Sequence, residues 1–457
     1  MTAFYAEIGV KGIQRYLART PRLRGRRGAS ARLADATNQE TMKRLLGARA
    51  KINEEAGSAD GVVSLIVDRD PEAIVDDVLA YLRTQLPGAE FQAAWSTGVD
   101  YLHAYQAIKE SRTAGRSPVT APFRTDLPVP PEFPFAAPCR LCRTAHAVDE
   151  VKLGDREVRQ VCADCRMRES HGTRSLGKDA EHRLARQLGV DRVQGFDELA
   201  RLDPRDDSPG SPSGNHLATV YADGNSMGIL FDRLAEDDGA LKKVISRKVS
   251  EHTWTALVRA TEQVRRPGEK SLCVVPHVVG GDDVLVSLPA ARAWPFVLAF
   301  LNGFGELMAE TLGERPGLPI PSASAGLIIA HVTTPFSLVV DNAERGLKQA
   351  KRLTRGRGSS VHALDVTVDG TDGARFPALK ADDLRDATAD LERLLTVPPA
   401  GRSNLLQELA VERDPVEGVK RAETLAKRMG FPEKIEPFTG GGPIGLGHAL
   451  RIVRWWR

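Results

Sequence analysis

The segment most informative about the fold is Leu217-Ala218-Thr219-Val220-Tyr221-Ala222-Asp223-Gly224-Asn225-Ser226-Met227-Gly228. Residues 217–222 are apolar enough to form a buried strand, and Asp223 stands where that strand is expected to end. An aspartate at a strand end can project its carboxylate beyond the edge of the sheet. The glycine that follows lets a phosphate or a metal ion approach the backbone closely. We therefore expect a polar site at this end of the strand.

A second acidic motif, Gly280-Gly281-Asp282-Asp283, lies between two apolar runs at 272–279 and 284–288. Such a pattern predicts a β-hairpin with its carboxylates at the tip. In a ferredoxin-like sheet this hairpin lies beside the strand 217–222, so Asp223 and Asp282 would face one another across a gap suited to Mg²⁺ or Mn²⁺. Either motif alone is more often a plain turn. Together they favour a metal site, because clustered carboxylates repel one another unless a cation is present.

The sequence around both motifs predicts an α/β unit with a four- or five-stranded, mainly antiparallel sheet. A helix expected over 338–354 buries one apolar face and leaves lysines on its polar side. Lys351 could meet a triphosphate there. Arg352 and Arg355 are expected to be solvated surface charges.

The rest of the chain divides into further segments. The N-terminal part predicts another mixed α/β unit, with a helical stretch at 11–46 that is broken by a basic loop. Prolines between 118 and 138 interrupt regular structure, and the stretch 204–214 is a linker rich in Pro, Ser, Gly and Asp. The end of the chain reads as helical. The two α/β units share a coarse order of elements, which suggests an ancient duplication without proving it.

Length and composition set limits on these interpretations. A chain of 457 residues is long enough for two to four domains. The formal net charge is only +3, so it gives no overall argument for nucleic-acid binding. The N-terminus lacks the apolar run of a signal peptide, and we find no stretch long enough to span a membrane. We expect a cytoplasmic protein with no membrane partner.

The cysteines predict a structural metal site. Cys139-x-x-Cys142 and Cys162-x-x-Cys165 can each present two thiolates, and two such pairs suit tetrahedral Zn²⁺. Four cysteine ligands leave no open position for catalysis. Two unrelated reduced pairs or a redox pair are weaker alternatives. Cys273 lies in an apolar run and is expected to be a core residue.

The basic segment between residues 19 and 32 contains no acidic residue and carries six arginines: Arg19, Arg22, Arg24, Arg26, Arg27 and Arg32. Arginine forks fit phosphate oxygens, so the segment could bind a triphosphate or RNA. A solvated surface loop fits the sequence equally well. No aromatic residue is interleaved, which leaves base stacking without support. The C-terminal run 451–457 could dock a partner or pack back onto its own domain.

The motifs together resemble a known family. The matching segments are Ala222-Asp223-Gly224 with Met227-Gly228, Gly280-Gly281-Asp282-Asp283, Ser324-Ala325-Gly326, and Ala343-Glu344 with Lys348 and Ala350-Lys351. They look like the second palm of the large subunit of type III CRISPR effector complexes, a family similar to GGDEF diguanylate cyclases. Residues 8–16 and 26–30 look like the start of that family's first palm.

This resemblance implies an α+β fold with two ferredoxin-like palm domains of the nucleotide-cyclase kind, an inserted zinc ribbon and a helical C-terminal domain. The expected boundaries are 1–115 for a degenerate first palm, 136–203 for the zinc ribbon with its following helices, 215–368 for the catalytic second palm and 377–457 for the C-terminal domain.

The resemblance also implies an activity. Active members of the family convert ATP to cyclic oligoadenylates, which act as antiviral second messengers, and they use two divalent metals. Here Asp223, Asp282 and Asp283 would be catalytic and hold Mg²⁺ or Mn²⁺. Nucleotide binding would fall to Gly224, Ser226, Gly280, Gly281, Ser324, Lys348 and Lys351. The expected partners are ATP, crRNA or target RNA, and other type III CRISPR subunits.

Three departures from the family pattern qualify this expectation. The family usually has an aspartate where Asn225 stands, and asparagine keeps an oxygen ligand but removes a charge. The histidine–aspartate nuclease domain of many members is not found, so DNA cleavage is not predicted. The C-terminal domain is short. The first palm, with Glu7 near its strand end and no Gly-Gly-Asp-Asp hairpin, is expected to lack catalytic metal but could bind a second nucleotide.

Two other functions remain open on the sequence. The chain could be a non-catalytic scaffold that binds nucleotide or RNA in a guide-RNA complex, as Asn225 hints. It could also be a stand-alone defence cyclase that works outside any CRISPR complex.

Overall fold

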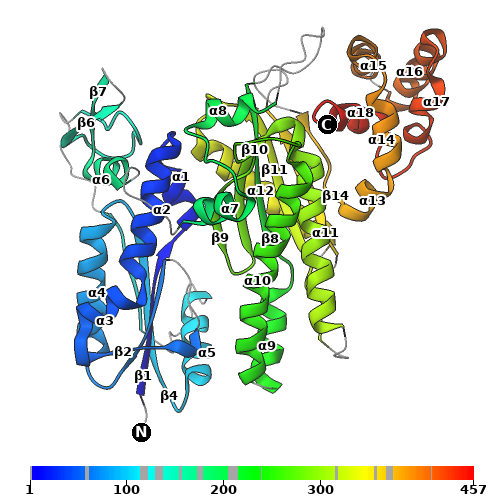
Figure 1. The fold of residues 1–457 in the computed structure, drawn as a ribbon. Helices are drawn as coiled ribbons and strands as arrows, with labels where there is room; N and C mark the ends of the chain where they lie inside the picture. Colours follow the sequence, from blue (N-terminus) through cyan, green and yellow to red (C-terminus); the bar gives the residue numbers. More distant parts are fainter. Residues whose placement is uncertain are drawn as a thin grey trace. The chain divides into compact units, whose positions relative to one another are not determined.

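The computed structural model describes residues 3–56, 61–113, 122–128, 137–153, 157–171, 179–203, 215–237, 239–313, 318–354, 358–366, 374–412 and 414–456. The predicted linker 204–214 and Arg355 lie outside these residues. The chain divides into two compact units. Unit 1 comprises Met1–Arg183 with Phe231–Ser250, and unit 2 comprises Leu184–Leu230 with Glu251–Arg457. Figure 1 shows the helices and strands of both.

Unit 1 is built on a five-stranded antiparallel sheet in the order β2-β3-β1-β4-β5. Its strands are β1 Ala3–Lys11, β2 Lys51–Ile52, β3 Val62–Val67, β4 Glu90–Gly98 and β5 Phe123–Asp126. The last strand falls within the proline-rich connector, where no regular element was predicted. That prediction was wrong at this point, because β5 pairs with β4 from Phe91 opposite Asp126 to Ala94 opposite Phe123.

The helices of unit 1 include the helical stretch expected at 11–46, and the basic loop expected to break that stretch needs a correction. They are α1 Ile13–Ala18, α2 Leu23–Thr37, α3 Gln39–Leu46, α4 Pro71–Gln85 and α5 Tyr101–Thr113, with 3-10 turns η1 Gly47–Arg49 and η2 Glu54–Ala56. In α4 the Asp70 side chain caps the first turn by accepting from the Ala73 amide at 3.2 Å. The basic segment predicted as a loop is helical from Leu23 onward.

The cysteine module of unit 1 contains a hairpin and a helix. The hairpin joins β6 Asp149–Leu153 to β7 Glu157–Val161, and α6 Ala163–His171 follows it. Two further helices, α7 Ala180–Leu188 and α8 Phe196–Arg201, come next in the chain. Both lie within the range 136–203, where helices were expected to follow the zinc ribbon.

Unit 2 contains a seven-stranded sheet in the order β13-β12-β11-β8-β10-β9, with β14 also paired to β12. Its strands are β8 His216–Gly224, β9 Val275–Gly280, β10 Asp283–Pro289, β11 Ala323–His331, β12 Ser360–Asp365, β13 Ala374–Arg375 and β14 Leu379–Lys380. Only β11 and β12 pair in parallel among the described strands of this sheet. The sheet is therefore mainly antiparallel, as predicted, but it has more strands than the four or five expected, since two two-residue strands extend it beside β12.

The helices that follow β8 are α9 Met227–Asp237, α10 Gly239–Val264, α11 Ala293–Leu312 and α12 Phe336–Thr354, with η3 Ala290–Arg292 before α11. The part of α9 and α10 from Phe231 to Ser250 belongs to unit 1, and the other residues of these helices belong to unit 2. Helix α12 packs closely on β11. A side chain at Gly326 would collide with the carbonyl oxygen of Ala343 and the amide nitrogen of Leu347. The Ser-Ala-Gly stretch therefore lets α12 approach the sheet, which brings its last turns to the end of β8.

The C-terminal part of unit 2 is helical, as predicted: α13 Ala381–Asp386, α14 Thr388–Leu395, α15 Pro399–Val411, α16 Pro415–Met429, α17 Pro432–Ile435, η4 Glu436–Phe438 and α18 Leu446–Val453. The terminal tryptophans pack back onto the same unit. Trp455 and Trp456 are buried, and the Trp455 indole donates to Asp365 at 2.6 Å. None of the described helices combines the length and apolarity needed to cross a bilayer.

Candidate active site

The structure brings the acidic motifs together at one end of the sheet. Strand β8 pairs with β10, with Ala222 opposite Val284, so Asp223 and Asp283 lie next to this pair at the adjoining strand ends. Gly224 lies against the hairpin tip, where a Cβ atom would come within 2.6 Å of Asp282 Oδ2. The glycine was expected to admit a phosphate or metal. In the structure it makes room for the Asp282 carboxylate.

The pKa values of Asp282 and Asp283 are both raised in this cluster. Burial and then the neighbouring Asp223 raise the pKa of Asp282 to about 6. Burial raises the pKa of Asp283 to about 9, with the Asp223 carboxyl adding to the effect. Both shifts have the direction expected for carboxylates held together away from water. The cluster therefore favours a proton or a cation.

Lys351 supplies a positive charge to this cluster. Its ammonium donates to the Asp223 carboxylate and, at 2.8 Å, to the backbone carbonyl of Gly224. Both partners are about 130 residues away in sequence. Lys351 thus lies at the acidic site and contacts a carboxylate there; its predicted contact with a triphosphate stays a prediction.

Tyr221 is a site residue that the sequence analysis missed. Side chains alternate along a strand, so Tyr221 shares a face of β8 with Asp223. It is buried, and its pKa is raised above its usual range by burial and by the adjacent Asp283 and Asp223 carboxylates. The signal that could have found it is its position two residues before Asp223 in the same strand.

The remaining residues predicted to bind nucleotide occupy different environments. Gly280 and Gly281 are exposed at the hairpin tip, where an added Cβ would meet no atom within 4 Å, and Gly281 has a φ of 60°. Ser226 begins the turn into α9 with a left-handed φ of 60°. Lys348 points into solvent and pairs with Glu344 at 2.7 Å. Ser324 is fully buried, and its hydroxyl contacts protein groups.

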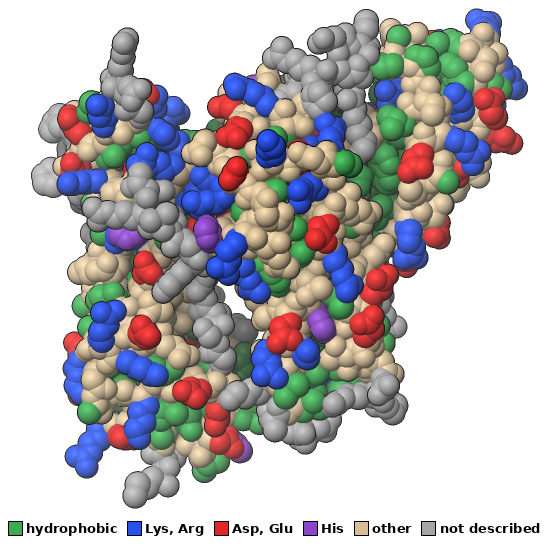
Figure 2. All heavy atoms as spheres, in the orientation of Figure 1, with side chains coloured by type: hydrophobic (Ala, Val, Ile, Leu, Met, Phe, Trp, Pro, Cys, Tyr) green, Lys and Arg blue, Asp and Glu red, His purple; other side chains and the backbone are tan. Residues whose placement is uncertain are grey.

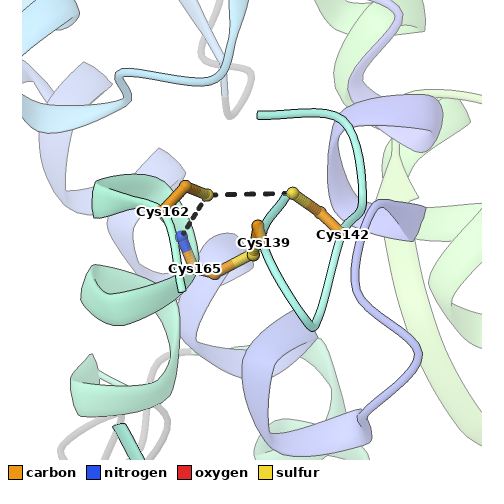
Figure 3. A group of neighbouring side chains, drawn as sticks. All are labelled: Cys139, Cys142, Cys162 and Cys165. Carbon is orange, nitrogen blue, oxygen red and sulfur yellow. Dashed lines mark hydrogen bonds between the residues drawn. The ribbon is translucent and has the colours of Figure 1, made fainter. Parts of the chain in front are cut away.

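The four cysteines of unit 1 converge on one point (Figure 3). All are buried, and their sulfur atoms all lie within 4.8 Å of one another. Cys142 and Cys162 are 3.7 Å apart between sulfurs. Hydrogen bonds from Cys139 and Cys162 hold the pKa of the Cys142 thiol below its usual range. Four convergent thiols from two Cys-x-x-Cys pairs are the donor set of a closed tetrahedral zinc site, so these residues fit the metal predicted for them.

The arginines of the basic segment turn toward protein groups. Glu169 on α6 lies 3.9 Å from Arg22 and 3.8 Å from Arg24. Arg27 forms a two-pronged pair with Glu181, with one contact at 2.6 Å. Three others bind backbone carbonyls: Arg19 to Gly88, Arg26 to Thr20, and Arg32 to Gln85.

Helix α2 therefore joins α6 of the cysteine module to α4. Because most of these guanidinium groups are engaged within unit 1, the structure supports neither a solvated loop nor an open phosphate-binding loop. Sequence could not show this, because the partners of Arg22, Arg24 and Arg27 lie about 150 residues away.

Glu7, the acidic residue of the first palm, is buried in the middle of β1. Its carboxylate accepts a hydrogen bond from the Tyr101 hydroxyl at 2.5 Å. Glu7 was expected near the end of this strand; in the structure it lies in the middle of the strand and its carboxylate is bound by Tyr101.

Comparisons with known proteins found a family model that matches part of the chain and solved structures that match nearly all of it. Residues 216–359 match the family model for the second palm domain of Cas10/Cmr2. No curated protein matches the chain. Among solved structures, the Csm1–Csm4 cassette in complex with cA4 matches with a TM-score of 0.58 and 14% identity, covering 99% of this chain and 69% of the other. The same cassette in complex with pppApA gives a TM-score of 0.57 at 14% identity, covering 100% and 69%.

Csm1 of T. onnurineus also matches, with a TM-score of 0.54 and 14% identity over 100% of this chain and 70% of that one. At these identities the likeness establishes the fold. It confirms the expected arrangement of palm sheets, cysteine module and helical C-terminal region. Residues 216–359 are thus a second palm domain of the Cas10/Cmr2 type, and the chain as a whole resembles the large Cas10 subunit, Csm1, of type III CRISPR complexes in fold.

Proposed function

We propose that this chain is a nucleotidyltransferase that joins ATP into cyclic oligoadenylates at the acidic end of the unit 2 sheet. The observation that carries the proposal is the convergence of Asp223, Asp282 and Asp283 at the ends of β8 and the β9–β10 hairpin. The ligands named with the Csm1 structures, cA4 and pppApA, support the choice of an adenine nucleotide.

The carboxylates fit a divalent cation. Burial, together with the neighbouring Asp223, raises the pKa values of Asp282 and Asp283, and oxygen donors of this kind suit Mg²⁺ or Mn²⁺. Bound divalent cations would activate a ribose hydroxyl and offset charge on the phosphates. Asp223, Asp282 and Asp283 would hold them.

The chain's own residues would position the nucleotides. In the transfer, a ribose hydroxyl oxygen bonds to the α-phosphorus of a second ATP. The bond from that phosphorus to the leaving pyrophosphate breaks, and the hydroxyl proton passes to solvent. Lys351 is placed to neutralise phosphate charge, since its ammonium already lies beside Asp223. The exposed glycines 280 and 281 leave room for phosphates at the hairpin tip.

The cysteine cluster has a separate role in this proposal. Cys139, Cys142, Cys162 and Cys165 would hold structural Zn²⁺, which would stabilise the module between the palms. In a complex, the chain would pair with other type III subunits, as Csm1 does with Csm4 in the solved cassettes. Basic and acidic side chains are intermingled on the face drawn in Figure 2, so a guide-RNA surface would have to be local.

The test is incubation of the purified chain with α-labelled ATP and Mn²⁺, alone and with target RNA and partner subunits, followed by mass spectrometry. The unaltered chain is expected to form cyclic or linear oligoadenylates, and the Asp282→Ala variant is expected to form none. Failure to form any such product under all these conditions would overturn the synthase activity. If Asp282→Ala then still assembled with its partners as the unaltered chain does, the scaffold function would replace it.

A further inference from the structure

Asn225 follows the acidic strand end, and its side chain is turned into the protein. It is 2% exposed. Its side-chain nitrogen lies 2.9 Å from each of three oxygens, namely Ser322 Oγ, Ser324 Oγ and the backbone carbonyl of Gly358. Its backbone amide also donates to the Ser322 carbonyl at 2.7 Å. Asn225 therefore joins the turn after β8 to the starts of β11 and β12.

The hydrogen bonds around Asn225 have a fixed direction. Ser360 Oγ donates to the carbonyl of Ala350 at 2.7 Å, and Ser322 Oγ donates to the carbonyl of Gly358 at 2.8 Å. A carbonyl can only accept, so both hydroxyl protons are committed. Ser324 then donates to Ser360, 2.9 Å away. The serine oxygens and the Gly358 carbonyl can therefore only accept from Asn225, which requires an NH₂ group at this position. Its two N–H bonds serve the three acceptors, so one N–H is shared between two of them.

The network leads back to the acidic site. It runs from Asn225 through Ser324 and Ser360 to the carbonyl of Ala350 on α12. The next residue, Lys351, contacts Asp223 and the carbonyl of Gly224. The chain of contacts thus closes on itself and holds the Asp223 turn and the lysine-bearing turn of α12 in one relative position.

We propose that Asn225 is a positioning residue that acts through its amide NH₂ group to hold Asp223 and Lys351 in place for cation binding. This inference rests on the proposed function of the acidic site. It revises the expectation that Asn225 serves through its oxygen. The Asn225 Oδ1 atom is buried and has no hydrogen-bond partner among the described residues, whereas the nitrogen carries every side-chain contact of the network.

The proposal and its rival make opposite predictions for Asn225→Asp. If the oxygen bound the cation, an aspartate would add charge and tighten binding. If the NH₂ group positions the site, an aspartate would place an oxygen against the Gly358 carbonyl with no proton to donate. The Ser322 and Ser324 oxygens would also lose the hydrogen bonds that Asn225 donates to them. Partners that orient metal ligands are worth about 10- to 100-fold in metal affinity, so a loss of about 10-fold or more is expected.

The experiment measures Mn²⁺ affinity of the full chain by electron paramagnetic resonance of unbound Mn²⁺, together with thermal unfolding in EDTA. Asn225→Asp, Asn225→Ala and Ser360→Ala are compared with Asn342→Asp. The control residue makes the same kind of bond at a more exposed place, from its side chain to the Leu338 carbonyl at 2.9 Å. Both Asn225 variants should bind Mn²⁺ about 10-fold more weakly or worse. Ser360→Ala should bind it a few-fold more weakly, and the control should be unchanged.

Tighter or unchanged binding by Asn225→Asp would overturn the inference. So would unchanged binding by Ser360→Ala, which tests the network from its far end if the Asn225 variants fail to fold. Absence of Mn²⁺ binding by the unaltered chain would overturn the metal site of the proposed function as well. Unaltered binding combined with insensitive variants would overturn this inference alone.

Discussion

Lys351 on α12 and Asp223 at the end of β8 form an ion pair across 128 residues of sequence, and the same ammonium also binds the carbonyl of Gly224. The lysine thereby joins the helix to the strand end at the place where the sheet gathers carboxylates. In the proposed function, a metal ion bound by Asp223 would have to share this carboxylate with the Lys351 ammonium. This competition makes Lys351 the most direct test of the site.

Lys351→Met should change metal binding and catalysis in opposite directions. Removing the ammonium frees the Asp223 carboxylate, so Mn²⁺ affinity in the absence of nucleotide should rise a few-fold. Oligoadenylate formation should fall by about 100-fold, the order of magnitude expected when an electrostatic partner of the reacting phosphates is lost. Lys420→Met, which removes an exposed lysine of the same unit that pairs with Glu417, is the matched control and should change neither. A parallel loss of Mn²⁺ binding in Lys351→Met would contradict this interpretation.

Asp283→Asn should stabilise the metal-free chain as the pH rises. The folded-state pKa of Asp283 is raised from 3.8 to about 9, so its ionised form is disfavoured on folding. Its contribution to stability is fully present below pH 3.8 and is lost as the pH rises toward 9. Urea unfolding in EDTA should show a clear gain in the free energy of unfolding for the variant at pH 8 and almost none at pH 4.

The control for this measurement is Asp386→Asn, an aspartate with a 78% exposed side chain in the same unit. It should show no comparable pH-dependent gain. Saturating Mn²⁺ should stabilise the unaltered chain and have less effect on Asp283→Asn. An equal gain for Asp283→Asn at pH 4 and pH 8 would show that charge repulsion is not its cause.

Gly224→Ala should disable the site without unfolding the chain. The added Cβ would lie 2.6 Å from Asp282 Oδ2 and 2.6 Å from the Met227 side chain, so the Asp282 carboxylate must move. A shift of about 1 Å in a catalytic group can cost on the order of 100-fold in rate. Gly228→Ala is the matched control, because a Cβ there meets nothing within 4 Å. Full product yield from Gly224→Ala would rule out a fixed position for Asp282.

Cys142→Ser should release zinc from the cysteine module. The four sulfurs are close enough to share one ion, and a structural site of this kind is weakened when any thiolate is lost. Metal analysis should give about one zinc per unaltered chain and much less in the variant, with a lower midpoint of thermal unfolding. Cys273→Ala, which alters the buried cysteine outside the cluster, should retain its zinc. Zinc-free unaltered protein with the same stability would contradict the prediction.

Arg27→Ala should reduce stability and leave RNA binding unaffected. The variant leaves the Glu181 carboxylate, 3% exposed, without its guanidinium partner, and breaking a buried pair costs about 3–5 kcal/mol. Glu181→Gln combined with Arg27→Ala should recover part of this loss. The measurement is chemical unfolding beside an RNA titration at two salt concentrations. A reduced salt dependence of RNA binding with unchanged stability would instead assign Arg27 to a phosphate contact.

The sequence by itself located the acidic strand end, the Gly-Gly-Asp-Asp hairpin, the cysteine pairs and most helices and strands. These features are local. A strand that ends in Asp223 or a hairpin tipped by Asp282 is specified by neighbouring residues, and each Cys-x-x-Cys pair is complete within four positions. The pairing of β8 with the hairpin followed from the expected topology, and the structure contains it.

The contacts of Asn225, Tyr221 and the arginines of the basic segment became known only from the tertiary structure. The sequence around Asn225 is typical of a turn. Its hydrogen-bond partners are Ser322, Ser324 and Gly358, which lie beside it only once the sheet has formed. The arginines look like a phosphate-binding loop until Glu169 and Glu181 are placed beside them. A polar side chain's function depends on which distant group satisfies it after burial, and that choice is made by the packing of elements far apart in the chain.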